Sequence, residues 1–196
     1  SISCCLEKKD AILIGEDICD TGPSTPIKYG GAFKVTDGLS TKFPNQVFNT
    51  TISEAGICGF IIGSSLSKVY SIGEIMFGDF MTLCFDQLTQ QASKIPQMFG
   101  KEVRIPFILR TPMGARRGYG PTHSQNIEKS FLFMPNINVF SLNCLVDASK
   151  IFQQIFDSKK NGSIVIEDKV SYTHYPVSSP VEGFDFFESS EEFKTF

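Results

Sequence analysis

The chain has 196 residues, which is enough for one α/β domain and short for two. Its 18 basic and 21 acidic side chains give a net charge of −3, so it has no basic field for a nucleic-acid partner. Apolar residues make up 41% of the chain and charged residues 20%, which excludes intrinsic disorder and fibrous repeats.

The cysteines give no sign of a metal or disulfide framework. They occur singly or side by side, and no C-x-x-C pair indicates zinc or a redox dithiol; the six are Cys4, Cys5, Cys19, Cys58, Cys84 and Cys144. We therefore predict reduced thiols in a cytoplasmic protein. No run approaches the roughly 18 apolar residues that a membrane span needs, and the start of the chain lacks a signal-peptide pattern.

Short apolar runs bounded by turn residues predict buried strands at 11–15, 71–77, 103–109, 137–142 and 163–167. Helical spacing between them predicts helices at 54–69, 79–95 and 144–158. This alternation predicts an α/β fold with three layers: a doubly wound, mainly parallel sheet with helices on both faces. Ligands of such sheets bind beyond the carboxyl ends of the strands.

Two loops are longer than their connections require, at 19–31 and 110–125, and long ordered loops on this architecture often carry function. From Ser171 onward the density of Pro, Ser and Glu rises. We expect one domain over 1–170 and, over 171–196, a linker toward a carboxyl-terminal domain that is absent, so the chain is expected to be part of a longer protein.

Glu54 is the first candidate for chemistry, because it opens an apolar helix directly after Ser53, a good helix cap. Burial favours the neutral form of such a carboxyl, and the positive end of a helix favours its charged form. A carboxyl balanced between the two can share a proton with a ring nitrogen of a ligand. An ordinary first-turn acid that favours the helix dipole is the alternative.

Three glycines follow Glu54 on one face of the same helix, at Gly56, Gly59 and Gly63. Each glycine costs a helix roughly 1 kcal/mol relative to alanine, so three on one face indicate that another backbone packs closely there. That backbone could belong to a partner subunit or to the sheet of the same domain.

His123 ends a glycine-rich loop and can transfer protons or bind an anionic group, although a solvated loop histidine would look the same. Arg116 and Arg117 in that loop could attract a carboxylate or could be a solvated turn. Phe77 and Phe80 could belong to the core or stack on a flat ring. The Gly-Gly pair at 30–31 has neither the lysine nor the spacing of a P-loop.

Taken in order, seven segments resemble the beta subunit of thiamine-diphosphate-dependent 2-oxo acid dehydrogenases, the decarboxylating components of the pyruvate and branched-chain complexes. The segments are GEDI (15–18), GGAFKVTDGL (30–39), FNTTISEAGICGFIIG (48–63), GEIMFGDF (73–80), FDQL (85–88), RTPMGARRGYGPTHSQ (110–125) and IEDK (166–169). The resemblance covers roughly residues 10–170. It implies a transketolase-like pyrimidine-binding domain with the thiamine-diphosphate-binding fold.

The resemblance also implies roles for four residues. Glu54 matches the glutamate that bonds a ring nitrogen of the aminopyrimidine and so promotes activation of the cofactor. Phe80 matches the aromatic ring that lies against the pyrimidine, and Met76 a neighbouring wall. His123 matches the active-site histidine that orients substrate or intermediate during acyl transfer to a lipoyl group.

The resemblance further implies a cofactor shared with a partner. The family holds the diphosphate and Mg²⁺ on another domain, through a G-D-G segment and a later Asn that this chain lacks. Expected partners are an alpha subunit or diphosphate-binding domain, a lipoyl acyltransferase and a small 2-oxo acid, in a homodimer or heterotetramer. The isolated chain should be inactive. The alternatives are an acetoin-cleaving or sugar-transferring relative, or a non-catalytic oligomerisation module.

Overall fold

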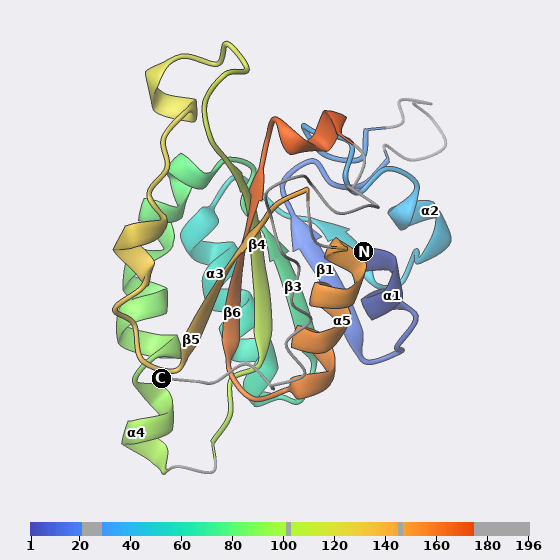
Figure 1. Ribbon diagram of the computed structural model, residues 1–196. Coiled ribbons are helices and arrows are strands. Elements are labelled where there is room, and N and C mark those ends of the chain that lie inside the picture. Colours follow the sequence, from blue (N-terminus) through green and yellow to red (C-terminus); the bar gives the residue numbers. More distant parts are fainter. Residues whose placement is uncertain (21–28, 101–102, 145–146, 175–196) are drawn as a thin grey trace, which may run out of the picture.

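Six short strands form one sheet in the order β2-β1-β3-β4-β6-β5, and every pairing in it is parallel (Figure 1). The computed structural model describes residues 1–20, 29–100, 103–144 and 147–174. The strands are β1 (Ala11–Gly15), β2 (Val47–Asn49), β3 (Tyr70–Glu74), β4 (Phe107–Met113), β5 (Ile137–Leu142) and β6 (Gly162–Asp168).

Helices of several kinds connect the strands. The α-helices are α1 (Ile2–Leu6), α2 (Leu39–Lys42), α3 (Glu54–Leu66), α4 (Ile95–Phe99) and α5 (Ala148–Ser158). The 3-10 helices are η1 (Gly78–Cys84), η3 (Pro121–His123), η4 (Glu128–Phe131) and η5 (Ser171–Thr173), and η2 (Gln87–Ala92) is a π-helix.

The sheet separates two apolar cores. On one face α3 packs with η1 and η2, and its side chains Ile57 and Ile61 are buried against the sheet. On the other face α1 packs with α5, where Leu6 and Phe152 are buried (Figure 1). This arrangement confirms the predicted three-layer α/β fold.

The predicted elements differ from the structure chiefly where backbone geometry is irregular. The strand at 137–142 is confirmed to the residue, whereas the edge strand β2 was not predicted because three residues carry no period. The single helix predicted at 79–95 is wrong: η1 and η2 are tightened and widened turns, and α4 starts at Ile95 with Pro96 in its first turn.

The strand predicted at 103–109 lies four residues further along, as β4. The apolar run on which the prediction rested ends at Leu109, and Arg110 follows it. In the structure β4 continues through Arg110 to Met113, and all seven of its residues are buried. The charge is tolerated because carboxylates on the neighbouring strands neutralise it.

The carboxyl ends of the strands meet at one edge of the sheet, and the loops at that edge close over it. The turn at 30–31 depends on glycine: Gly30 has φ +69°, and a Cβ there would lie 2.4 Å from the backbone of Asp37. A Cβ on Gly31, with φ +79°, would lie 3.2 Å from the carboxylate of Glu74. The Gly-Gly pair therefore allows a tight turn against this edge.

The predicted linker and one of the two long loops lie partly outside the described residues. Within the predicted linker, Ser171–Thr173 form η5 and pack against the sheet, whereas residues 175–196 lie outside the described part. In the long loop predicted at 19–31, residues 21–28 also lie outside it. None of the helices in the described ranges is long and apolar enough to span a membrane.

Candidate active site

Glu54 opens α3 at the carboxyl edge of the sheet. Ser53 precedes it in extended conformation, and the Ser53 hydroxyl accepts a hydrogen bond of 3.2 Å from the Gly56 amide, which caps the helix. The Glu54 residue is only 8% exposed. No hydrogen bond or ion pair to its carboxylate is made by the residues that the structure describes. The group is thus nearly buried and available to a ligand.

A second carboxylate stands beside it. Glu16 directly follows β1 and is 6% exposed, and its Oε1 accepts a hydrogen bond of 3.1 Å from the Ser53 amide. Burial raises the pKa of Glu16, and the negative charge of Glu54 raises it further. Glu16 and Glu54 therefore share one nearly buried region between β1 and α3.

His123 lies in a cluster of aromatic rings. Its imidazole meets Phe77 edge-on at a centroid distance of 4.6 Å and Phe80 at 5.2 Å. The rings of Phe33 and Tyr119 both contact Phe77, at 5.5 and 5.4 Å. The Nδ1 atom of His123 hydrogen-bonds with the Thr122 hydroxyl at 2.9 Å, which leaves Nε2 for another partner.

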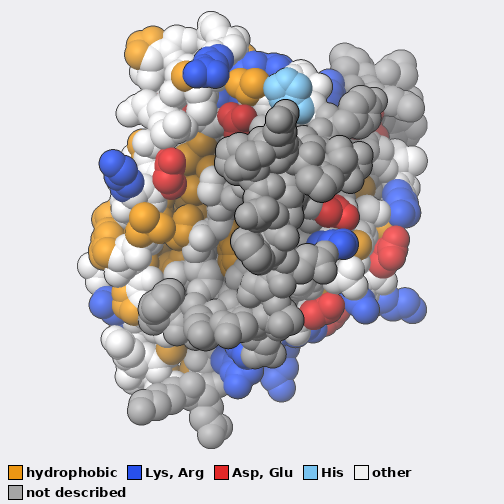
Figure 2. All heavy atoms as spheres, viewed as in Figure 1, with side chains coloured by type: hydrophobic (Ala, Val, Ile, Leu, Met, Phe, Trp, Pro, Cys, Tyr) orange, Lys and Arg blue, Asp and Glu red, His pale blue; other side chains and the backbone are white. Residues whose placement is uncertain are grey.

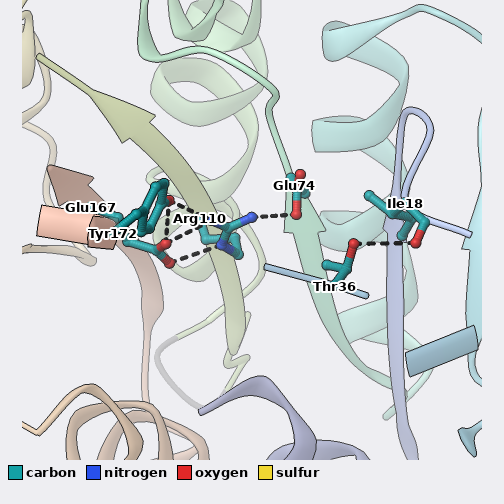
Figure 3. A network of polar contacts seen from close by, with 6 residues as sticks. All are labelled: Ile18, Thr36, Glu74, Arg110, Glu167 and Tyr172. Atoms are coloured by element: carbon teal, nitrogen blue, oxygen red, sulfur yellow. Dashed lines mark hydrogen bonds and ion pairs between the residues drawn. The ribbon is translucent and has the colours of Figure 1, made fainter. Parts of the chain in front are cut away.

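A buried ion-pair network supports this edge from below (Figure 3). Arg110 on β4 donates to both carboxylate oxygens of Glu167 on β6, at 2.8 and 2.6 Å, and also to Glu74 at the end of β3. The hydroxyl of Tyr172 accepts from Arg110 at 2.9 Å and donates to Glu167 at 2.5 Å. The network ties β3, β4, β6 and η5 together.

The pKa values of the two carboxylates in the network shift in opposite directions. Burial raises the pKa of Glu74, and its single contact with Arg110 does not offset that. Burial also opposes ionisation of Glu167, but the charge of Arg110 and the hydrogen bonds from Arg110 and Tyr172 outweigh it, so the pKa of Glu167 is lowered. Both carboxylates hold the pKa of Arg110 above its usual value.

Two further side chains hold the loop that carries His123. The Asp79 carboxylate in η1 accepts from the side chain and amide of Gln125, at 2.9 and 3.3 Å. The ammonium of Lys169, just after β6, donates to the backbone carbonyl of His123. The loop is therefore anchored at both His123 and Gln125.

A family model for the transketolase pyrimidine-binding domain matches residues 3–174, which covers every element of this sheet and both glutamates beside α3. The chain belongs to this family. The domain is 35% identical over 130 residues to the beta subunit of the acetoin:2,6-dichlorophenolindophenol oxidoreductase of Cupriavidus necator, covering 65% of this chain and 38% of that one.

Two other relatives of this pyrimidine-binding domain match over more of its length. It is 29% identical to the pyruvate dehydrogenase E1 component subunit beta of Rickettsia bellii, over 89% of this chain and 51% of the relative. The 2-oxoisovalerate dehydrogenase subunit beta of Dictyostelium discoideum is also 29% identical, over 89% of this chain and 45% of its own. The chain thus spans about half the length of the curated relatives it matches.

Among solved structures, a split-gene transketolase described as an inactive beta4 tetramer superposes with a TM-score of 0.58. It covers 83% of this chain and 46% of its own, at 16% sequence identity. This similarity supports the fold of the pyrimidine-binding domain.

The structure joins some of the four predicted site residues and leaves others apart. Phe80 and His123 are in ring contact, although 43 residues separate them in the sequence. Met76 is half-buried just beyond β3, on the segment that leads to Phe80. Glu54 joins that segment through its own carbonyl, which accepts from the Cys84 thiol of η1 at 3.4 Å. Within the described residues, no hydrogen bond or ion pair joins the Glu54 carboxylate to the ring cluster.

Several residues near this site have no role that the sequence predicts. Glu16, Glu74, Arg110 and Glu167 all lie at or near the end of an apolar strand run. That position was the available signal, because the carboxyl ends of parallel strands gather at one edge. Arg116 and Arg117 are exposed on the loop.

The glycine face of α3 is directed away from the sheet of this domain. A Cβ on Gly63 would meet no described atom within 4 Å, and one on Gly59 would meet the Gln87 side chain at 4.0 Å. Phe60 on the same helix is 53% exposed, and Leu83 on η1 is 55% exposed. Figure 2 shows hydrophobic side chains gathered on the left of the view, where η2 and η4 lie in Figure 1. The glycines therefore do not serve packing of α3 on its own sheet.

Proposed function

We propose that this chain is the pyrimidine-binding half of the beta subunit of a thiamine-diphosphate-dependent 2-oxo acid dehydrogenase. In the complete enzyme it would take part in oxidative decarboxylation of a 2-oxo acid and in acyl transfer to a lipoyl group. Its similarity to the pyruvate and 2-oxoisovalerate dehydrogenase beta subunits supports this proposal.

The observation that carries the proposal is the Glu54 carboxylate, nearly buried at a helix N-terminus and without a partner among the described side chains. A carboxyl in such a place can share a proton with a ring nitrogen of a ligand. Its apolar surroundings favour the neutral carboxyl, and the positive end of the helix dipole favours the charged carboxylate. In this proposal Glu54 holds a proton at its carboxyl oxygen for a pyrimidine nitrogen.

Three further residues fit the remaining requirements of such a site. Phe80 is half-buried and offers a ring to stack on the pyrimidine, and Met76 forms an adjacent apolar wall. His123 keeps Nε2 available to orient the substrate. Thiamine diphosphate, when bound, supplies a carbon nucleophile and an electron sink for decarboxylation.

We assign the diphosphate and Mg²⁺ to a partner, an alpha subunit or diphosphate-binding domain of the same enzyme. The exposed surface that includes Gly59, Gly63 and Phe60 on α3 supports a partner on this side, in a homodimer or heterotetramer. A lipoyl acyltransferase would take the acyl group. All six cysteines are free, which supports a reducing, cytoplasmic setting.

Cleavage of acetoin is the second candidate function. The beta subunits of acetoin oxidoreductases from Cupriavidus necator and Bacillus subtilis are 35% and 31% identical to this chain. Assays of the complete enzyme with pyruvate, branched 2-oxo acids and acetoin, with dichlorophenolindophenol as acceptor, distinguish the two functions by the substrate turned over.

The deciding experiment is the Glu54→Gln substitution in the complete enzyme. Gln keeps the size of the side chain but cannot give up a proton, so we expect activity to fall by at least about 100-fold, the scale of general acid–base catalysis. Glu7→Gln, at an exposed glutamate on the opposite layer, is the matched control. Full activity in Glu54→Gln would refute the proposed role.

Calorimetry tests how the site is divided. We expect thiamine diphosphate with Mg²⁺ to bind the complete enzyme and to give no heat of binding with this chain alone, provided that circular dichroism shows the chain to be folded. Tight binding by the chain alone would contradict the assignment of the diphosphate to a partner. A non-catalytic module would bind in neither case.

A further inference from the structure

We propose that Lys169 is a positioning residue for His123, holding the active-site loop in place through the His123 backbone. This inference rests on the proposed function, because that function is what assigns His123 the role of orienting the substrate. The geometry on which it depends belongs to this chain alone.

Lys169 follows β6 and is fully buried, with an exposed fraction of 0%. Its amide donates to the carbonyl of Met113 at 3.0 Å, so the backbone is fixed beside the end of β4. Its ammonium donates to the His123 carbonyl and lies over the rings of Phe77 and Tyr119, 5.2 and 5.7 Å from their centroids. The cation is held by a carbonyl and two π faces.

An ordinary structural lysine would pair with a carboxylate. In the described ranges, the ion pairs do not include Lys169. Burial lowers the pKa of Lys169; the charges of Asp79 and Asp168 oppose this, and that of Arg117 adds to it. Among the described residues, the hydrogen-bond partner of the Lys169 ammonium is the carbonyl of His123.

The loop that carries His123 contains little regular secondary structure, so contacts with the rest of the domain must hold it in place. Between Met113 and Ser124 it contains one short element, η3. Four of its residues adopt positive φ, namely Gly114, Arg116, Gly118 and Gly120. Besides ring contacts and a backbone hydrogen bond of 3.4 Å from the Gly114 amide to the Gln125 carbonyl, the described contacts that hold the loop are those of Asp79 at Gln125 and of Lys169 at His123. The Lys169 anchor is the one that acts on the histidine itself.

The two kinds of contact act on the same group. Phe77 lies under the ammonium of Lys169 and meets the imidazole of His123 edge-on at 4.6 Å. Lys169 thus fixes both the backbone of His123 and the ring against which its side chain rests. Its removal should loosen the imidazole while leaving Glu54, at the start of α3, in place.

The test uses the full-length chain assembled with its partner subunit and compares Lys169→Met, Lys169→Arg and the control Lys159→Met. Lys159 also lies over a ring, that of Phe156, but is exposed on the α1–α5 layer. The first measurement is hydrogen exchange of the 114–125 amides without cofactor. We expect about tenfold faster exchange in Lys169→Met, as for loss of one hydrogen bond from a charged donor.

The second measurement is the rate of lipoyl acylation. We expect kcat to fall by about tenfold in Lys169→Met, with thiamine diphosphate affinity within about twofold of wild type and partial recovery in Lys169→Arg. In a His123→Ala background, Lys169→Met should cause no further loss, because Lys169 acts through His123. A loss that adds fully to that of His123→Ala would overturn the inference.

Unchanged exchange of the 114–125 amides in Lys169→Met would overturn it as well. If Lys169→Met does not fold, Lys169→Gln, which keeps a hydrogen-bond donor at shorter reach, is carried through the same measurements. The exchange arm needs no turnover, so it decides the role of Lys169 even if the wild-type enzyme shows no thiamine-diphosphate-dependent activity. That latter result would refute the proposed function instead.

Discussion

Arg110 and Glu167 form a two-bond ion pair across neighbouring strands, with N–O distances of 2.8 and 2.6 Å and both side chains almost fully buried. Substituting Arg110→Met leaves the carboxylates of Glu167 and Glu74 buried without a cation. We expect a loss of about 3–5 kcal/mol in the free energy of unfolding, measured by urea denaturation. Arg116→Met, on the exposed loop, is the control and should change stability little. Equal stability of the two variants would count against the network.

Tyr172 extends the same network beyond the predicted domain boundary at 170. Its hydroxyl bridges Arg110 and Glu167, so Tyr172→Phe removes two hydrogen bonds to charged groups. We expect a loss of about 2 kcal/mol in the free energy of unfolding. Tyr119→Phe, at a ring that is 43% exposed, serves as the control. If the boundary at 170 is correct, Tyr172→Phe should behave like that control.

Glu16 makes the stability of the domain depend on pH in a direction that can be checked. Its pKa is raised in the folded state, so the folded chain binds protons more readily than the unfolded chain there. Stability is therefore lost as pH rises through the folded pKa. Glu16→Gln should raise the Tm at pH 7 and leave it unchanged at about pH 3, below the ordinary glutamate pKa.

The control for that experiment is Glu7→Gln, because the Glu7 side chain is 63% exposed. In Glu16→Gln, the side-chain oxygen of the introduced glutamine can still accept the hydrogen bond from the Ser53 amide, so the substitution changes mainly charge. A Tm difference of the same size at both pH values would show that titration of Glu16 is not the cause.

Substitution of Gly63 is expected to affect the stability of the chain and its assembly with a partner in opposite directions. A Cβ there meets nothing within 4 Å, so Gly63→Ala should stabilise the free chain by about 1 kcal/mol through helix propensity. In the complete enzyme the same methyl group would stand in the proposed interface. We expect weaker assembly, measured as a higher dissociation constant in analytical ultracentrifugation. Gln153→Ala, at an exposed position on α5, should leave assembly unchanged; so would Gly63→Ala if this face binds no partner.

Local patterns in the sequence were sufficient to predict the three-layer architecture of the fold. The run at 137–142 is a strand, and Ser53 starts a helix at Glu54, because an apolar run and a cap act over a few residues. The long-range pairs could not be read in this way. Arg110 meets carboxylates that lie 36 and 57 residues away, so its position inside a strand looked like the end of one.

Only part of the candidate site could be predicted, because its contacts are also long-range. Contact between Phe80 and His123 depends on how η1 and the 114–125 loop meet, which no local pattern describes. The roles of Glu54, Met76, Phe80 and His123 came from resemblance and stay predictions. The sequence does not identify Lys169 as a site residue, because a lysine that follows a strand is usually solvated. Lys169 is buried only through the three-dimensional fold.

The strand order also determines when the sheet of this domain can be completed during synthesis of the chain. Of the strands that the structure describes, β6 is made last, yet it lies between β4 and β5, and β5 has no other neighbour in the described sheet. A nascent chain that ends before residue 162 therefore exposes one side of β4, leaves β5 unattached and leaves the guanidinium of Arg110 without Glu167. Pairing of β6 with β4 and with β5 must wait until β6 is made, and until then the unfinished sheet offers an open strand edge to other chains.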